Sequence, residues 1–240
     1  ISNARFENCA LKGTILDGSI LEGAVFSKCE LSGARLAGAV CVNAVFADCA
    51  LLETVLEKAA LTHANLSNSD LTGANLSGLD AGNMTASGVS LKNASLKKAH
   101  LYWSNLRDAD LTGADLTGAD CGRVDFNGAK LGGIAFTGMK LGKAELVRVS
   151  LAGVRFEKCD LTMADCRESD FSGAEFVECI LFQAGFEGAV LKGAKLGGHE
   201  AYAARFIGAN LSGADLSRMV VEYGRSEERR VGKECRSRCS

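Results

Sequence analysis

The stretch Ala109–Asp120 reads ADLTGADLTGAD, two copies of the unit Ala-Asp-Leu-Thr-Gly and the start of a third. A period of five is neither the 3.6-residue period of an α-helix nor the two-residue period of a half-buried strand. A unit this short cannot bury its own apolar residue, so successive units must stack into a common core. The same period extends in both directions along the chain.

Every fifth residue from Phe6 to Leu216 occupies the central position of such a unit, and these 43 positions hold 27 Leu, 10 Phe, 3 Cys and 3 Ala. A small residue usually stands two positions earlier, and Gly stands two positions later in 20 units. We expect the central and the small residue to point inward, and the Gly to occupy a turn with φ > 0, where a Cβ would clash. The lack of Pro suits a long ladder that needs every backbone N–H.

A second period of twenty residues is superimposed on the first. It is carried by Phe-x-x-Cys segments that begin at Phe6, Phe26 and Phe46, and again at Phe156 and Phe176. Like side chains stacked in successive rungs produce such ladders. Four units therefore make one coil, and we predict an all-β fold, a four-sided parallel β-helix solenoid. It has about eleven coils of 20 residues, and at about 4.8 Å per rung the rod is about 50 Å long.

We expect a single repeat domain over residues 1–224, because no linker or insertion breaks the register there. Residues 225–240 lack the pattern and carry six basic and three acidic residues. This segment resembles the translation of a sequencing adapter, so we expect a non-native or disordered basic tail. The alternative is a genuine basic arm. The chain begins at Ile1 rather than Met, as a fragment of a longer protein would.

Charge and hydropathy limit the classes of partner. The chain has a formal net charge of −2, and residues 1–224 alone carry 21 basic and 26 acidic residues. A mildly acidic surface argues against direct binding of nucleic acid, which requires a basic footprint. No apolar run is long enough to cross a bilayer, so we expect no membrane contact.

The unit Ala-(Asp/Asn)-Leu recurs along the chain, and four clear examples begin at Ala64, Ala74, Ala114 and Ala214. Over about residues 1–221 the sequence resembles the pentapeptide-repeat family. The resemblance implies the right-handed quadrilateral β-helix of that family and a bacterial origin. The best understood members resemble B-form DNA in shape and charge and bind DNA gyrase, and some of them confer quinolone resistance.

Residues with catalytic or metal-binding chemistry are present but do not converge. The three histidines, His63, His100 and His199, fall at different positions of the unit and far apart. In the twenty-residue frame the successive aspartates of the opening repeat lie on different sides of the rod, so they cannot share one ion or substrate. We therefore predict a non-enzymatic protein without cofactor or metal, and we expect His199 to be a packed core residue.

The cysteines of the repeat occupy inward positions. Free Cys behaves as a small apolar residue when it is buried, and parallel side chains one rung apart point the wrong way for easy bridging. We expect reduced thiols and a cytoplasmic location.

One surface feature stands out. Five aromatic residues lie outside the core positions: Tyr102, Trp103, Phe182, Tyr202 and Tyr223. All five, and Met163 with them, fall at the second or third place of the twenty-residue frame, which is one side of the rod. Clustered exposed aromatics are typical of interaction surfaces. The alternative is that these side chains only cover an irregular wall above small core residues.

These patterns predict a protein-interaction or scaffold module that binds a protein partner or a second copy of itself. One alternative is a DNA-mimicking binder of DNA gyrase, which requires continuous rows of carboxylates. Here the rows are interrupted by lysines such as Lys130 and Lys140. Another alternative is a repeat module of a larger secretion or signalling protein.

Overall fold

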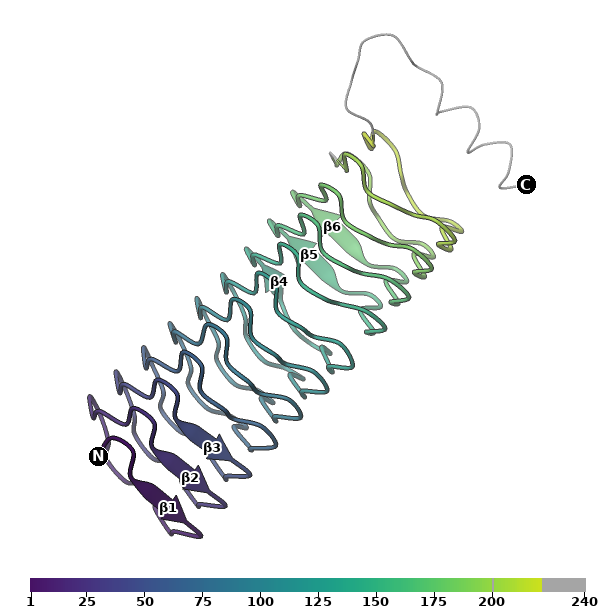
Figure 1. Ribbon diagram of the computed structural model, residues 1–240. Helices are drawn as coiled ribbons and strands as arrows, with labels where there is room; N and C mark the ends of the chain where they lie inside the picture. The colour runs from purple at the N-terminus through teal and green to yellow at the C-terminus, as the bar shows by residue number, and fades with distance from the viewer. Residues whose placement is uncertain (200, 222–240) are drawn as a thin grey trace.

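The computed structural model describes residues 1–199 and 201–221. The chain winds into a straight rod of stacked coils, with the N-terminus at one end (Figure 1). Within the described residues the regular elements are six short strands: β1 (Arg5–Glu7), β2 (Val25–Ser27), β3 (Val45–Ala47), β4 (Phe136–Thr137), β5 (Arg155–Glu157) and β6 (Glu175–Val177). The predicted tail at 225–240 and the candidate Tyr223 lie outside the described residues.

The strands form two parallel sheets, β1-β2-β3 and β4-β5-β6. Within each sheet, consecutive strands pair at a spacing of twenty residues, for example Phe6 with Phe26 and Phe26 with Phe46. Between the sheets, isolated parallel bridges with the same spacing of twenty continue the ladder at four positions of each coil. The predicted all-β, parallel architecture is confirmed, and the twenty-residue period is the pairing register.

The core is the stack of central and small residues. They are buried from Leu21 to Ala201 except for Val154, which is partly buried, as are Phe6, Leu11 and Leu16 in the first coil. Like side chains stack: the ring centroids of Phe6 and Phe26 are 4.7 Å apart, and those of Phe26 and Phe46 are 4.8 Å apart. The spacing of the rings equals that of hydrogen-bonded strands, so the aromatic ladder and the backbone ladder reinforce each other.

The turns confirm the prediction for the glycines and extend it. Every fifth residue from Asn3 to Arg218 has φ between 52° and 79°, and 20 of these residues are Gly while 24 carry a side chain. This left-handed conformation costs an ordinary L-residue roughly 1 kcal/mol or more, whereas Gly adopts it freely. The fold therefore demands the conformation at each turn, but it does not demand Gly.

The Phe-x-x-Cys ladder has a hydrogen-bonding role that its periodicity alone does not reveal. In most units the carbonyl of the central residue accepts from the N–H three residues later, as Leu11 does from Thr14 at 3.1 Å. The six Phe residues at the strands lack that bond, and a side chain 23 residues later replaces it. The donors are the Cys29, Cys49, Ser69, Cys159, Cys179 and His199 side chains.

Candidate interaction surface

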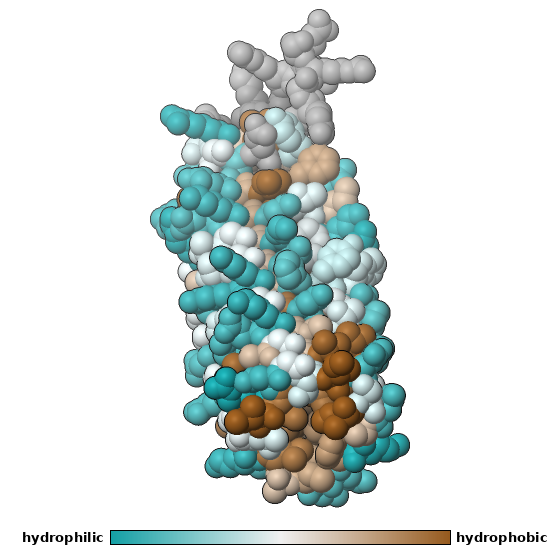
Figure 2. Space-filling view, turned by 90° about the vertical axis from the view of Figure 1, so that its left-hand side faces the viewer, coloured by the Kyte–Doolittle hydropathy of each residue, from teal (hydrophilic) through white to brown (hydrophobic). Residues whose placement is uncertain are grey.

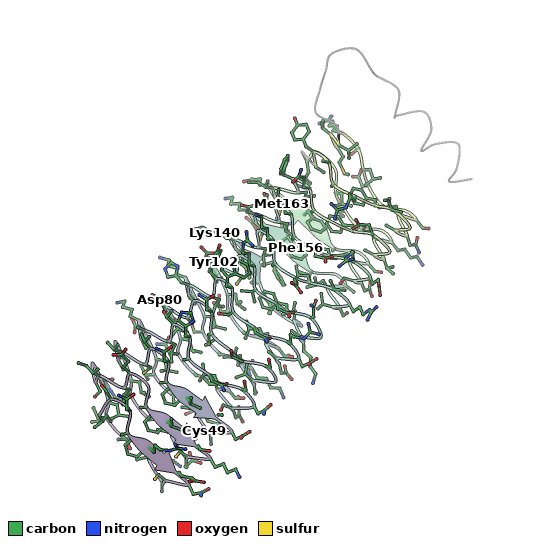
Figure 3. The ribbon with its side chains drawn as sticks, viewed as in Figure 1. Cys49, Asp80, Tyr102, Lys140, Phe156 and Met163 are labelled. Atoms are coloured by element: carbon green, nitrogen blue, oxygen red, sulfur yellow. The ribbon has the colours of Figure 1, made fainter. Side chains whose placement is uncertain are left out.

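We define the aromatic corner by the turn residues that follow the central residues 101, 121, 141, 161, 181 and 201, namely Tyr102, Trp103, Arg123, Lys143, Met163, Phe182 and Tyr202. The pairing register of twenty places these residues in two adjacent columns on successive coils. Figure 3 shows the labelled members Tyr102 and Met163 on one edge of the rod, together with Asp80 and Lys140.

Tyr102 and Trp103 form the exposed centre of the aromatic corner. Their side chains are 45% and 49% exposed. The two rings meet edge to face, with centroids 5.9 Å apart and planes at 87°, a favoured aromatic arrangement. The Arg123 guanidinium lies over the Trp103 ring, 4.3 Å from its centroid, where a cation is attracted by the ring face. The two rings therefore present a preorganised apolar surface with a cation beside it.

The other predicted residues lie farther along the same corner. Met163 is 40% exposed, and Phe182 and Tyr202 are half-buried. Phe182 and Tyr202 line an open hollow of about 500 Å³ together with Cys179, His199, Glu178, Ile180 and Gly198. Phe182 is four coils from Tyr102, about 19 Å at the ladder spacing. The structure thus brings Tyr102 to Trp103 and Phe182 to Tyr202, but it keeps the two pairs apart.

The backbone of this corner distinguishes it from the other turns. Gly occupies only one of its eleven left-handed positions, Gly23, whereas it occupies nine of eleven at the turn ten residues later in each coil, from Gly13 to Gly213. From Trp103 to Gln183 the side chains are bulky: φ is 63° at Trp103, 58° at Arg123 and 59° at Lys143. Asn tolerates this conformation and large side chains do so poorly. The side chains of this column are therefore held at a backbone cost, as are those at the other turns without Gly.

Two residues of this surface, Arg123 and Lys143, are absent from the set predicted from the sequence. The signal that identifies them is the scarcity of Gly in their column, which is visible only after the register of twenty has been applied to the turn positions.

His199 is a buried core residue, as predicted, with 7% of its surface exposed. Its Nε2 lies 2.7 Å from the carbonyl oxygen of Phe176. The imidazole replaces the small residue of its unit while Ala201 replaces the large one, so the pair conserves core volume. Its hydrogen bond to the Phe176 carbonyl identifies it as a structural partner of β6.

The cysteines are buried thiols. All eight within the described residues are free, and seven of them are buried. Burial raises the pKa of the Cys41 thiol to about 12 and that of Cys49 to about 11. A thiol with so high a pKa is a poor nucleophile near neutral pH. Within the described part of the chain, no group of three or more His, Cys, Asp or Glu side chains is placed to hold a metal ion.

The aspartates of the opening repeat are paired with lysines on neighbouring coils. Asp110 lies between Lys92 and Lys130, with each Nζ 3.4 Å from its Oδ2. Asp115 pairs with Lys97 at 3.0 Å, and Asp120 pairs with Lys140 at 3.5 Å. Burial tends to raise the pKa of Asp110, but hydrogen bonds from Thr112 and Lys92 outweigh it and lower the value to about 2. The aspartates of the opening repeat therefore strengthen the stacking of coils.

A second apolar surface lies near the N-terminal end, where Figure 2 shows hydrophobic side chains gathered on the first coils. Ile15 is 73% exposed and Ile20 is 57% exposed, and Ile20 pairs with Val40 on the next coil. All three are β-branched residues, which are favoured at ladder positions.

The described part of the chain holds no helix with the length and hydropathy that a bilayer span requires.

The comparisons with known proteins match the repeat itself. The family model described as pentapeptide repeats matches residues 4–40, 39–78, 87–120, 119–157, 150–188 and 184–218. Among solved structures, HetL of Nostoc sp. strain PCC 7120, described as involved in heterocyst differentiation regulation, is 26% identical, with 92% of this chain and 90% of that chain covered and a TM-score of 0.41.

Two further solved structures are similar. QnrB1, described as a plasmid-mediated fluoroquinolone resistance protein, is 17% identical, with 91% of each chain covered and a TM-score of 0.38. A thylakoid-lumen protein of Arabidopsis thaliana is 25% identical over 51% of this chain and 68% of that chain, with a TM-score of 0.20. No curated protein matches.

Proposed function

Because the chain belongs to the pentapeptide-repeat family, we propose that it is a non-enzymatic protein-interaction module whose contact surface is the aromatic corner. We further infer that its parallel ladder is a right-handed, four-sided β-helix of about eleven coils. A rigid solenoid of this kind presents a column of side chains at fixed spacing, which suits recognition of an extended or flat partner.

The observation that supports this surface above others is the combination of exposure and backbone cost at Trp103. Its ring is half exposed, and it is held by Tyr102 and Arg123. It also occupies a left-handed turn position at which Gly would be easier to accommodate. Large aromatic side chains with a neighbouring Arg are enriched among the residues that dominate binding energy at interfaces.

The DNA-mimic alternative is disfavoured by the ion pairs. Mimicry of DNA requires an uncompensated carboxylate for each phosphate, and duplex DNA carries one charge per about 1.7 Å. On this rod Asp110, Asp115 and Asp120 each have a lysine within 3.5 Å. The local charge is thus largely balanced.

The proposed function is tested by selecting peptides from a random displayed library on the immobilised full chain. Enriched peptides are then titrated against the natural protein, Tyr102→Ser and Trp103→Ser. Ile207→Ser serves as the control, because Ile207 is 75% exposed and lies outside the aromatic corner. We expect Trp103→Ser to weaken binding at least about tenfold and the control to leave it unchanged. Equal binding to all variants would reject the aromatic corner as the contact surface.

A second copy of the chain is the other partner to examine, and light scattering distinguishes it. If the natural protein is dimeric through this corner, Trp103→Ser lowers the measured mass to that of the monomer while Ile207→Ser does not. A dimer that persists in Trp103→Ser is held by another surface.

A further inference from the structure

We propose that the aromatic corner binds an acidic peptide segment in an extended conformation, whose carboxylates contact Arg123 and Lys143 and whose apolar side chains contact Trp103 and Met163. This inference rests on the proposed interaction function and names the chemistry of the partner. Its first support is the arrangement of charges.

About half of the cations in the described part of the rod lie opposite a carboxylate on a neighbouring coil. Arg155 lies 3.0 Å from Glu175, and Arg148 lies 2.7 Å from Glu168. Arg123 and Lys143 are not opposed in this way. Neither has a carboxylate within ion-pair distance among the described residues, and they are the one pair of such cations there that occupy the same column on successive coils. Stacked like charges are destabilising, and a bound anion would relieve the repulsion.

The nearest carboxylates along the chain are already engaged elsewhere. Asp125 pairs with Arg107 at 3.0 Å, and Glu145 accepts a hydrogen bond from Asn127 Nδ2 at 2.9 Å. On the other side of the corner, Asp120 pairs with Lys140 at 3.5 Å. The two cations therefore remain available to a carboxylate supplied from outside the chain.

The surface beside Lys143 is partly exposed backbone at Gly142. Gly122, which precedes Arg123, is instead buried against the Tyr102 ring, and its N–H donates to Asp120 Oδ1 at 3.2 Å. Both glycines have ordinary backbone angles. A Cβ at Gly142 would meet only the Thr162 carbonyl oxygen, at 3.7 Å, so the fold does not require Gly there. Its N–H has no acceptor among the described residues. Gly at such a position permits close approach of another backbone, and the N–H is available to an incoming carboxylate.

The spacing sets the length of the segment. Trp103, Arg123, Lys143 and Met163 lie on four successive coils, so the column spans about 14 Å at the ladder spacing, which an extended peptide of about five residues covers. The matching sequence carries two acidic residues between two apolar or aromatic ones. A basic segment would repel Arg123 and Lys143, and a neutral segment would leave both cations without a carboxylate partner.

The decisive experiment compares two synthetic peptides that share apolar residues and differ only in Glu against Gln at the central positions. They are titrated against the natural protein, Arg123→Glu/Lys143→Glu, and the control Lys28→Glu/Lys98→Glu. The control cations also occupy left-handed turns, with φ of 52° and 54°. We expect the Glu peptide to bind at least about tenfold more tightly than the Gln peptide. That preference should disappear in the double variant of the corner and remain in the control.

A measurement without any peptide tests the local charge. Trp103 is the single Trp of the chain, so its fluorescence reports on this corner alone. Iodide should quench this fluorescence more than caesium does. Lys143→Glu should reduce the ratio of iodide quenching to caesium quenching, while Lys98→Glu should leave that ratio unchanged. Acrylamide, which is neutral, corrects for any change in exposure. Equal quenching by iodide and caesium in the natural protein would overturn the inference.

The outcomes separate this inference from the proposed function. Peptides that require Trp103 but bind equally well with Glu or Gln would overturn the acidic partner and leave the interaction surface intact. Peptides that depend on neither the ring nor the cations would overturn both. A single-stranded oligonucleotide that binds more tightly than the Glu peptide would identify a different class of partner and would likewise overturn the inference.

Discussion

At the scale of single residues, the left-handed turns are the most general feature of the molecule. The same conformation is imposed on Gly and on residues as large as Trp103, which shows that the ladder dictates the turn and the side chain only sets its energetic cost. The sequence predicts this conformation wherever Gly recurs. It does not reveal it at Trp103, Arg123 or Lys143, because nothing local in those residues favours a left-handed turn.

Two exposed glycines test the turn conformation directly. A Cβ would meet nothing within 4 Å at either Gly153 or Gly132, but only Gly153 has a left-handed backbone, with φ of +68°. We predict that Gly153→Ala lowers the free energy of unfolding by about 1 kcal/mol. Gly132→Ala should change it by less than about 0.5 kcal/mol, or raise it slightly. Urea unfolding of the two variants measures the difference, and equal effects would contradict a left-handed turn at Gly153.

Asp110 gives a prediction for pH. Its folded pKa of about 2 is below the ordinary value of 3.8. The stabilisation from its charge is therefore fully present above about pH 4, and it is lost as the pH falls toward 2. Asp110→Asn keeps an acceptor for Thr112 but removes the charge. We predict that the variant is less stable at pH 7 by no more than about 1 kcal/mol, because the pairs lie at the surface.

The difference in the free energy of unfolding between Asp110→Asn and the natural protein should disappear as the pH falls from 4 to 2. Denaturant unfolding at pH 7, 4 and 2.5 measures it. A gap that widens as the pH falls would mean that the carboxyl is not stabilised in its charged form.

At the scale of elements, each of the six strands contains a Phe whose carbonyl accepts a hydrogen bond from a side chain 23 residues later. In the interior of each Phe ladder the donor is a Cys. Cys29 Sγ lies 3.4 Å from the Phe6 carbonyl oxygen, and Cys49 Sγ lies 3.4 Å from the Phe26 carbonyl oxygen. Ser69 ends one series and His199 ends the other. The sequence predicts the Phe and Cys ladders from their period, but the bond between them spans 23 residues and becomes evident only in the folded coil.

Ser69 is the best position to test that role. It is buried, it donates to the Phe46 carbonyl, and it accepts from the Cys49 N–H at 2.9 Å. Ser69→Ala leaves both buried groups unpaired, so we predict a loss of about 2 to 3 kcal/mol in the free energy of unfolding. Ser69→Cys restores the donor used elsewhere in the same column, and it should cost less than about 1 kcal/mol. Equal losses for the two variants would show that volume alone matters.

At the scale of the whole molecule, the period of five and the period of twenty together predict the parallel ladder, the buried residues and the absence of a break in the register. They also place the aromatic residues on one side of the rod. They do not predict that Arg123 and Lys143 lack carboxylate partners, because that depends on the conformation of long side chains across coils.

The paired carboxylates lead to a prediction about gyrase. We expect no inhibition of DNA supercoiling and no protection from quinolones by the purified protein at micromolar concentration, because Asp110, Asp115 and Asp120 are each opposed by lysine. Inhibition that is lost when these aspartates are changed to Asn would restore the DNA-mimic alternative.

The most direct test of the binding surface is the fluorescence of Trp103 during titration with the peptides selected on the full chain. We predict a saturable change in its emission that is abolished in Arg123→Glu/Lys143→Glu and preserved in Lys28→Glu/Lys98→Glu. Tight binding of the selected peptides with no change in the emission of Trp103 would contradict the assignment of the aromatic corner as the contact surface.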